Sequence, residues 1–252
     1  MRAWRCGGLL VGQYRVGQRQ RGRPVALYRT GEHPCGYYPE RIARDLVLDP
    51  RDPSLADAYP SALSQGFRRS GGHVYRPNCP MCRACVPVRL RVRDFRPDRS
   101  QRRCLRDNQD VVDRMVPPLR TKDTFALYRR YLLARHGDGP MAETDEDDFD
   151  RFIASGWSPT RFLQLRLGER LLAVAVTDST ADALSAVYTF FDPDERARSL
   201  GTLCILRQIA CAQRTGREFL YLGYWIDGHP KMHYKTRFRP LEVLGVGGWR
   251  EL

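Results

Sequence analysis

One continuous stretch decides the expected fold: RFLQLRLGERLLAVAVTDSTADALSAVYTFF, residues 161–191. Apolar residues alternate with polar or small ones in three segments of it, Arg161–Leu167, Leu171–Thr177 and Leu184–Phe191. Alternation with a period of two is typical of β-strands, and the short connections predict antiparallel pairing of the three strands. A three-stranded meander is therefore the expected centre of the fold.

The residues after this meander predict a helix and one further strand. Helical spacing runs through Ser199–Arg214, with Leu203 and Leu206 on the apolar face, and ends at Gly216. The segment Glu218–Tyr224 again has strand character. The order of meander, helix and strand matches the core of GNAT-type acyltransferases, so a GNAT-like domain with a mixed sheet is expected.

Two helices are expected before the meander. Phe125, Tyr128 and Leu132 give Lys122–Ala134 an apolar stripe, with Thr121 as a plausible cap. The segment Glu143–Asp150 places acidic residues in the first turn of a second helix, where the helix dipole favours them.

The part of the chain before Pro117 has a different character. It is dense in Gly, Pro, Arg and Cys, with one short helix expected at Ala58–Gln65. Its best strand is Val86–Val92, which should bury one face and leave the other basic. We therefore predict an α+β protein in which residues 1–116 form a small cysteine- and arginine-rich domain for substrate recognition and residues 117–252 form the GNAT-like transfer domain.

Composition narrows the class of function. The 252 residues have a formal net charge of +13, which favours a polyanionic partner, with RNA or DNA ahead of an anionic membrane. No apolar run reaches the roughly 20 residues of a membrane helix. The start, Met1–Arg15, has only the short apolar segment Gly7–Gly12 where a secretory signal needs about 7–15 apolar residues. A cytoplasmic protein is expected.

The turn before the predicted helix argues against coenzyme A as the acyl carrier. GNAT acetyltransferases hold the coenzyme A pyrophosphate on an R/Q-x-x-G-x-G/A turn at a helix N-terminus. Arg198 and Gly201 fit this pattern, but Leu203 stands where Gly or Ala is needed. Together with the basic charge, this favours an acyl group delivered on RNA.

A set of motifs, in order along most of the chain, resembles the arginyl-tRNA-protein transferase family. The motifs are His33-Pro-Cys-Gly-Tyr-Tyr-Pro39, Gly66-Phe-Arg-Arg-Ser-Gly71, Tyr75-Arg-Pro77, Cys79-x-x-Cys-x-x-Cys85, Val187-Tyr-x-Phe-Phe-Asp-Pro-Asp194, Ser199-Leu-Gly-Thr202, Tyr221-Leu-Gly-Tyr-Trp225 and Lys231-Met-x-Tyr-Lys235. The eukaryotic arginyl branch has C-G-Y-C where this chain has Cys35-Gly-Tyr-Tyr38. The resemblance is therefore to the bacterial aspartate/glutamate leucyltransferase branch.

The resemblance implies an aminoacyltransferase that moves leucine from Leu-tRNA to the N-terminal Asp or Glu of acceptor proteins, marking them for N-degron-dependent degradation. No cofactor is required for the transfer, because the aminoacyl ester is already activated. Three alternatives stay open: arginyl transfer by the same fold, a coenzyme A-dependent acetyltransferase, and a non-enzymatic nucleic-acid-binding regulator. The oligomeric state is not specified by the sequence.

The cysteine motif is a candidate metal site. Cys79, Cys82 and Cys85 are spaced so that their thiols can converge on one ion, and Cys35 can supply a fourth. Zn²⁺ or an iron–sulfur cluster suits four thiolates, and cysteines of the eukaryotic relatives are implicated in such sites. The alternative is a set of buried, reduced thiols beside the substrate pocket.

Basic residues supply the candidate substrate contacts. The eight arginines within Arg89–Arg106 are candidates for tRNA phosphates, with a solvated basic face as the alternative. Arg68, Arg69 and Arg76 are expected to receive the acceptor's side-chain carboxylate. Lys231 and Lys235 are expected on acceptor-end phosphates, and Tyr234 on the terminal adenine.

Two residues are candidates for general-base catalysis: Tyr188 and Asp192, at the end of the last meander strand. The neutral N-terminal amine of the acceptor attacks the ester carbonyl and expels a ribose hydroxyl, so any base has a modest task. The alternative is a packed strand tyrosine and a turn aspartate before Pro193.

Overall fold

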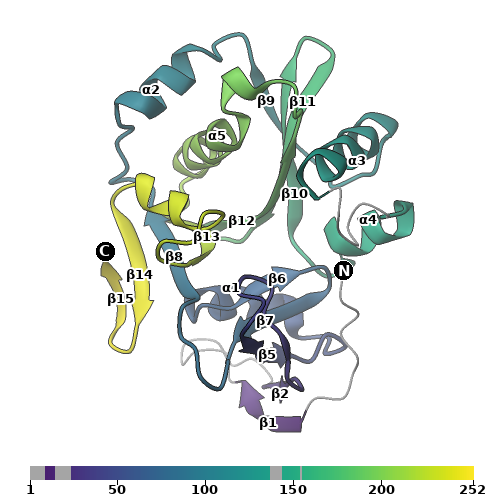
Figure 1. Cartoon of the computed structure of the whole chain (residues 1–252), viewed down its shortest axis with the longest axis vertical. Helices are drawn as coiled ribbons and strands as arrows, with labels where there is room; N and C mark the ends of the chain where they lie inside the picture. The colour runs from purple at the N-terminus through teal and green to yellow at the C-terminus, as the bar shows by residue number, and fades with distance from the viewer. Residues whose placement is uncertain (1–8, 15–23, 137–143, 154) are drawn as a thin grey trace.

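The computed structural model describes residues 9–14, 24–136, 144–153 and 155–252 (Figure 1). Most of the Met1–Arg15 segment and the start of the predicted Glu143–Asp150 helix lie outside these ranges. None of the described helices is both long and apolar enough to cross a membrane.

The smaller of the two main sheets is built from the first part of the chain. It is antiparallel, with five strands in the order β1-β2-β5-β7-β6. Its elements are β1 (Leu9–Tyr14), β2 (Val25–Arg29), β5 (Asp45–Leu48), β6 (Arg68–Ser70) and β7 (His73–Pro77), with α1 (Leu55–Ser64) beside them and the short pair β3 (His33–Pro34) and β4 (Ile42–Ala43).

The larger sheet has eight strands in the order β15-β14-β8-β13-β12-β11-β10-β9. The strands are β8 (Val86–Arg91), β9 (Val112–Val116), β10 (Thr160–Leu167), β11 (Arg170–Ser179), β12 (Ala183–Phe191), β13 (Phe219–Trp225), β14 (Leu241–Gly245) and β15 (Gly248–Glu251). Every neighbouring pair is antiparallel except β12 and β13, which are parallel.

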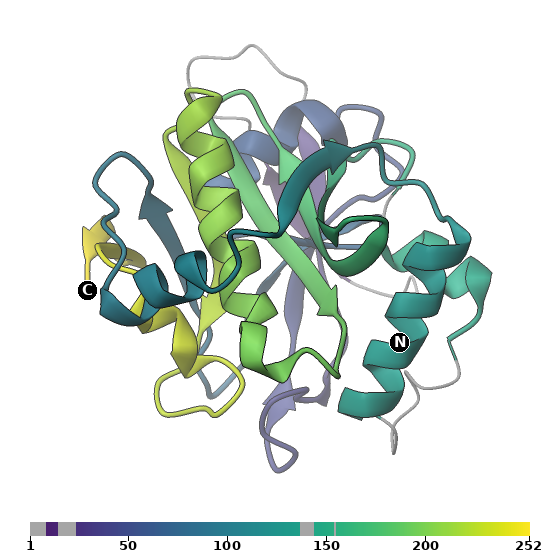
Figure 2. The same cartoon turned by 90° about the horizontal axis from the view of Figure 1, so that it is seen from above.

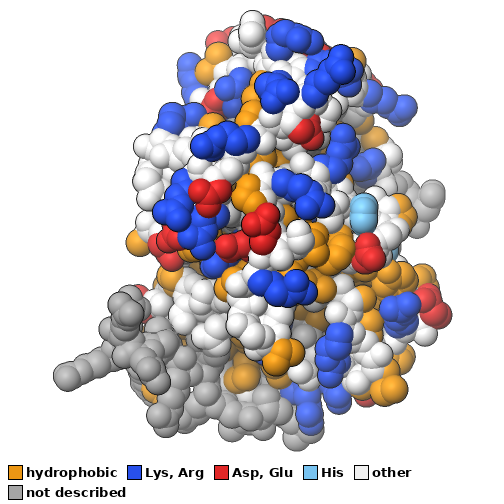
Figure 3. All heavy atoms as spheres, turned by 90° about the vertical axis from the view of Figure 1, so that its left-hand side faces the viewer, with side chains coloured by type: hydrophobic (Ala, Val, Ile, Leu, Met, Phe, Trp, Pro, Cys, Tyr) orange, Lys and Arg blue, Asp and Glu red, His pale blue; other side chains and the backbone are white. Residues whose placement is uncertain are grey.

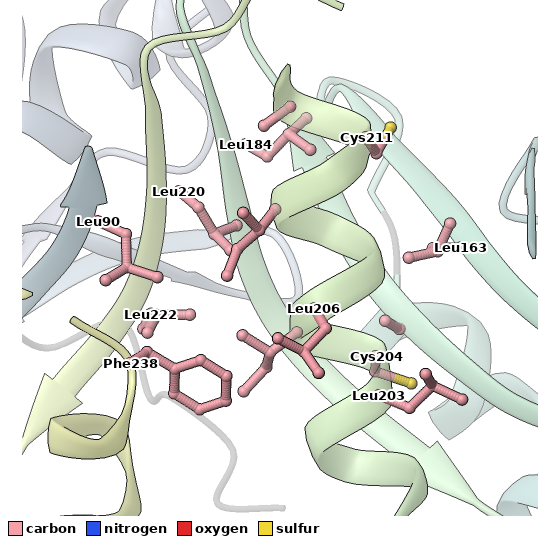
Figure 4. Close-up of a cluster of buried hydrophobic side chains, with 14 of the residues drawn as sticks. Leu90, Leu163, Leu184, Leu203, Cys204, Leu206, Cys211, Leu220, Leu222 and Phe238 are labelled. Atoms are coloured by element: carbon pink, nitrogen blue, oxygen red, sulfur yellow. The ribbon is translucent and has the colours of Figure 1, made fainter. Parts of the chain in front are cut away.

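Both faces of this sheet are covered. Helices α2 (Arg99–Arg106) and α5 (Leu200–Arg214) pack on one face, and α3 (Lys122–His136) and α4 (Glu146–Ile153) pack on the other (Figure 2). Apolar side chains alternate between the two faces of the strands, so they contribute to both hydrophobic layers. Leu163 of β10 packs on the α5 side, and its neighbour Phe162 packs on the α3 side. Figure 4 shows Leu203 and Leu206 of α5 among side chains of the sheet.

The predicted meander is confirmed, because β10, β11 and β12 pair antiparallel in sequence order. The predicted helices Lys122–Ala134 and Ser199–Arg214 correspond to α3 and α5. The hydroxyl of Thr121 accepts a hydrogen bond from the Thr124 amide at 3.3 Å, as expected of a cap. The short helix expected at Ala58–Gln65 begins earlier, at Leu55.

The sheets do not follow the predicted division after residue 116. Strands β8 and β9 come from the first 116 residues but belong to the large sheet, whereas the small sheet ends with β7 at Pro77. The reason is packing: Val88 and Leu90 of β8 are buried in the same core as α5. The chain therefore passes from one sheet to the other between Pro77 and Val86.

Candidate active site

The parallel strands β12 and β13 diverge at the centre of the large sheet. Their pairing covers only Ala183–Ser185 against Phe219–Tyr221. Beyond this, β12 continues against β11 and β13 continues against β8. We call the region between Ala186–Tyr188 and Leu222–Tyr224 the notch.

Arg68 of β6 reaches into the notch from the small sheet. Its Nη2 donates to the carbonyl oxygens of Ala186 at 2.8 Å and Val187 at 3.3 Å, the first β12 residues past the paired stretch. A water-sized cavity of about 10 Å³ lies beside it, lined in part by Ser185 and Gly223. Within the described residues no Asp or Glu pairs with this guanidinium. Arg68 is thus a fixed positive charge without an acidic partner.

Four tyrosines surround Arg68, and with it they form what we call the Arg68 pocket. They come from different parts of the chain: Tyr37, Tyr75, Tyr224 and Tyr234. Burial raises the pKa of each hydroxyl, and the charge of Arg68 partly opposes the rise. All four stay protonated near neutral pH, so the pocket carries positive charge and hydrogen-bond donors.

The pocket is fixed on the inside and open on the outside. Tyr224 donates its hydroxyl hydrogen to carbonyl oxygens of the small sheet region, Gly66 at 3.0 Å and Tyr75 at 3.3 Å. Tyr234, in the 3₁₀ turn η3 (His233–Arg237), is 44% exposed. A ligand can therefore approach from the η3 side.

Lys235 does not lie where a phosphate contact was expected. It is buried, with 4% of its surface exposed, and its Nζ donates to the Tyr224 carbonyl oxygen and to Met232 Sδ. Its assignment to a tRNA phosphate is corrected, because the amine points into the protein beside Arg68. Lys231, in contrast, is exposed and remains a candidate for a phosphate.

Arg69 is also reassigned. It forms a bidentate ion pair with Asp178 of β11, at 2.7 and 2.8 Å, and both side chains are fully buried. Its other donors go to Gly71, Ile153 and Thr160. Because these partners occupy the guanidinium, Arg69 joins the small sheet to the large one and cannot receive an acceptor carboxylate.

Arg76 faces away from Arg68. In the β6–β7 pairing Arg68 is opposite Tyr75, so the next residue, Arg76, points to the other side of the sheet. There it stacks on Phe67 at 5.0 Å and donates to the Gln65 carbonyl at 2.9 Å. The three arginines predicted as one carboxylate site therefore separate, and Arg68 alone lies at the notch.

Asp192 is not placed to act as a base. It is 1% exposed, and its oxygens pair with Arg130 at 2.8 Å and Arg170 at 2.7 Å. Burial would raise the pKa of its carboxyl, but the hydrogen bonds and charges of these partners outweigh burial and lower it. The catalytic prediction for Asp192 is corrected, since the carboxylate ties β12 to α3 and β11.

Tyr188 points from the notch into an aromatic cluster with Phe152, Tyr128 and Tyr131. Burial and the neighbouring tyrosines raise the pKa of its hydroxyl, which rules out a general base at neutral pH. The hydroxyl is buried and has no hydrogen-bond partner among the described residues. Tyr188 can therefore donate a hydrogen bond but cannot take a proton.

The cysteines of the predicted metal site lie in one region beside the pocket. Burial and the nearby thiols of Cys35, Cys79 and Cys82 raise the pKa of Cys85 to about 12. A hydrogen bond from the Ala84 amide and the charge of Arg41 lower the pKa of Cys82. In the described part of the chain, however, no three His, Cys, Asp or Glu side chains are placed to hold one metal ion. As arranged, the residues do not fit a metal or cluster, and no step is assigned to one.

The basic stretch Arg89–Arg106 divides into two kinds of arginine. Arg89 and Arg91 of β8 pair with Glu242, at 2.6 and 3.3 Å, and Arg89 also lies over Phe219 and Trp249. The remaining six, Arg93, Arg96, Arg99, Arg102, Arg103 and Arg106, are exposed. Figure 3 shows many Lys and Arg side chains on the upper part of the face to which α2 and β14 belong. This surface remains a candidate for tRNA.

The turn before α5 is occupied by protein. Arg198 forms a bidentate pair with Asp110 at 2.9 Å, and the Asn108 side chain donates to the Arg198 carbonyl at 3.0 Å. Leu203 is fully buried in the core rather than at a phosphate. Arg198, the basic residue of the expected pyrophosphate turn, is therefore already paired.

Sequence reasoning missed Tyr37, Tyr75, Tyr224 and Gly223 as parts of a site, and it assigned Tyr234 to the terminal adenine without placing it beside Arg68. The motifs that contain Tyr37, Tyr75 and Tyr224 were recognised, but no role was given to these side chains. The available signal was the number of tyrosines within otherwise basic motifs. These side chains come together because the chain passes from one sheet to the other. The spacing of the motifs along the sequence does not reveal this.

Comparison with known proteins identifies the family. Residues 33–103 match the model described as "Arginine-tRNA-protein transferase, N terminus", and residues 123–245 match the one described as "Arginine-tRNA-protein transferase, C terminus". The chain belongs to this family. Residues 104–122 separate the two matched regions.

Several family relatives are named "Aspartate/glutamate leucyltransferase". One from Xanthomonas euvesicatoria pv. vesicatoria (strain 85-10) is 60% identical over 234 residues, covering 90% of this chain and 93% of the relative. One from Stenotrophomonas maltophilia (strain R551-3) is 54% identical over 233 residues, with the same coverage. Among solved structures, the C-terminal domain of a putative lysylphosphatidylglycerol synthetase from Agrobacterium fabrum matches with a TM-score of 0.45 and 14% identity, over 69% of this chain and 52% of that one.

Proposed function

We propose that this chain transfers leucine from Leu-tRNA to the N-terminal Asp or Glu of acceptor proteins. The product would be marked for N-degron-dependent degradation, in the cytoplasm. The relatives named aspartate/glutamate leucyltransferase support the reaction. The observation that carries the acceptor assignment is Arg68, a positive charge in the notch with no acidic partner among the described residues.

The acceptor's side-chain carboxylate binds Arg68. A free amine is common to all N-termini, so only the side chain distinguishes Asp and Glu. A guanidinium and a carboxylate form charge-assisted hydrogen bonds worth about 1.5–3 kcal/mol each. Arg68 already donates through Nη2 to β12, which fixes its orientation. The protonated Tyr37 and Tyr234 supply further donors around it.

The leucyl end of the tRNA enters from the side of η3. Tyr234 is partly exposed and available to stack on the terminal adenine, and the exposed Lys231 contacts a phosphate. The exposed arginines of α2 contact the tRNA body. This arrangement brings the ester to the β12–β13 notch, beside Arg68.

The transfer itself needs alignment more than strong catalysis. The α-amine attacks the ester carbonyl, and the ribose oxygen leaves. Holding both partners in attack geometry supplies much of the rate, and no metal or coenzyme is needed for an activated ester. Coenzyme A is disfavoured, since Arg198 is paired with Asp110.

A transfer assay tests the function. The protein is incubated with separately charged Leu-tRNA, Phe-tRNA or Arg-tRNA, together with peptides beginning with Asp, Glu, Lys or Ala. We expect leucine on the Asp and Glu peptides only. Transfer of arginine instead would keep the assigned reaction type but change the donor from Leu-tRNA to Arg-tRNA. No transfer from any tRNA would refute the proposed function.

The same assay tests the acceptor site through Arg68→Ala. At saturating Leu-tRNA, the peptide KM should rise about 10-fold or more, with tRNA binding unchanged, because a lost charge-assisted pair is worth at least one factor of ten. Arg76→Ala is the matched control, since Arg76 lies on the opposite face of the same sheet. Weakened tRNA binding with an unchanged peptide KM would show that Arg68 contacts the tRNA rather than the acceptor peptide.

A further inference from the structure

Lys235 is a buried lysine without an acidic partner in the described part of the chain. It is 4% exposed, and its Nζ has two polar neighbours, the Tyr224 carbonyl oxygen and Met232 Sδ. The ring of Tyr234 is 5.7 Å from Nζ. A buried lysine normally pairs with a carboxylate, so this environment calls for another explanation.

The neighbours of Nζ match a neutral amine better than an ammonium. An ammonium has three N–H donors, and one of them would be buried without an acceptor here. A neutral amine has two N–H donors, which the carbonyl and the thioether accept, and a lone pair that no described group occupies. The hydrogen-bonding pattern therefore favours a lone pair kept free inside the site.

The charges around Lys235 act in the same direction. Burial is the largest cause that lowers its pKa, and the permanent charge of Arg68 adds to it. Cys85, on the segment before β8, acts in the opposite direction and more weakly. Of the tyrosines on β13 and η3, Tyr224 and Tyr234 stay protonated, since burial raises the pKa of both. Among the described residues, no carboxylate next to Nζ opposes this lowering.

We propose that Lys235 is a catalytic residue that accepts a proton from the acceptor's α-ammonium group while the acceptor's carboxylate is held by Arg68. In an N-terminal Asp or Glu the carboxylate and the amine are only a few bonds apart. Nζ and Arg68 both lie against Tyr224, since Nζ donates to its carbonyl oxygen and the Arg68 guanidinium carbon is 6.0 Å from its ring centroid. A substrate anchored on Arg68 therefore presents its amine on the side of Nζ. This inference rests on the proposed function and names the group that activates the acceptor.

Each proton of the α-ammonium group is accounted for in this step. The α-ammonium begins with three protons, and one passes to Nζ, leaving an amine that attacks the ester carbonyl carbon. The new C–N bond forms, and the C–O bond to the ribose breaks. A second proton goes from the nitrogen to the departing ribose oxygen, and the third stays on the amide. Lys235 then releases its proton to solvent before the next turnover.

Chemical rescue tests the proposal in the full-length protein. Lys235→Ala should lower kcat by about 10-fold at pH 7 and saturating Leu-tRNA and Glu-peptide, with little change in peptide KM, because roughly a tenth of an α-amine with a pKa of about 8 is already neutral there. Trimethylamine should restore part of kcat, with the largest effect between the usual pKa of the acceptor's α-amine, about 8, and the pKa of the added amine, because the step needs both an α-ammonium and a neutral base. Tetramethylammonium has nearly the same size but no lone pair, so it should restore nothing. Trimethylamine cannot form a stable amide and therefore does not compete as an acceptor.

Two further variants make the outcome decisive. Lys235→Met keeps most of the apolar stem and replaces Lys235→Ala if that variant does not fold, while Lys122→Met removes an exposed lysine as the control. A folded Lys235→Met with kcat within about two-fold of the original protein would overturn the proposal. Equal rescue by both additives, or by neither, would also overturn it, because a structural role needs no lone pair. If the unmodified protein transfers no leucine, the proposed function fails first.

Discussion

Arg68 lies directly against the backbone of Gly223, so that a Cβ atom at position 223 would be 1.0 Å from Nη1 and 2.2 Å from Cζ of Arg68. Gly223 also has a φ of +83°, which glycine adopts without strain. The glycine sits at the irregularity in the β13–β8 pairing, where β13 bends away from β12. The shape of the notch and the position of the guanidinium therefore depend on one missing side chain.

Gly223→Ala should displace Arg68 and raise the peptide KM about 10-fold or more, as loss of a charge-assisted pair would. Steady-state transfer at saturating Leu-tRNA measures this. Gly228→Ala is the control, because Gly228 also has a positive φ, +64°, but no heavy atom near its would-be Cβ. An equal rise in KM in both variants would assign the effect to backbone strain rather than to Arg68.

The Arg69–Asp178 pair should govern stability rather than substrate binding. Breaking a buried ion pair by removing one partner costs about 3–5 kcal/mol, because the other charge stays buried and unpaired. We expect Arg69→Met to lower the free energy of unfolding by an amount in this range in urea titration. The double variant Arg69→Met with Asp178→Leu should recover much of the loss. If Arg69→Met keeps the full free energy of unfolding and raises the peptide KM, Arg69 binds the acceptor rather than stabilising the fold.

The sequence does not predict which of the two neighbouring arginines, Arg68 or Arg69, faces the notch. The strand that holds them, β6, has three residues, too few for alternation to show which side chain faces the notch. Adjacent residues point to opposite sides, so one is a structural tie and the other a candidate ligand-binding group. The longer meander strands gave enough repeats to predict their pairing correctly.

Asp192 and Lys235 were misassigned for a related reason. The partners of Asp192, Arg130 and Arg170, lie far away in sequence and are brought to it by α3 and β11. Lys235 is buried because η3 folds back over the end of β13, and a five-residue turn has no pattern that predicts this. Local motifs marked the right segments, and tertiary packing decided the role of each side chain.

Lys231→Ala should weaken binding of charged tRNA more than use of the peptide, because its proposed partner is a phosphate. Loss of one phosphate contact should reduce the slope of log affinity against log salt by about 0.7–0.9. Binding of Leu-tRNA measured across a range of salt concentrations tests this. Lys122→Ala, at the exposed start of α3, is the control for loss of one positive charge. An unchanged slope with intact affinity would place Lys231 outside the tRNA interface.

Tyr188→Phe separates a packing role from hydrogen-bond donation. The Tyr188 hydroxyl is buried without a partner among the residues that the structure describes. Removing such a hydroxyl takes away an unsatisfied polar group, so the stability of the free protein should stay equal or rise slightly.

If the hydroxyl donates to the ester carbonyl oxygen, kcat should fall about 100-fold or more, as when an oxyanion donor is removed. Because burial keeps the phenol protonated, the fall should be the same across pH 6 to 9, from roughly two units below to one unit above the usual α-amine pKa of about 8. Single-turnover transfer with saturating Leu-tRNA and Glu-peptide, alongside a thermal melt, measures both quantities. A kcat within about two-fold of the original protein would leave Tyr188 as a packing residue, and a lower melting temperature would show that its hydroxyl has a partner in solution.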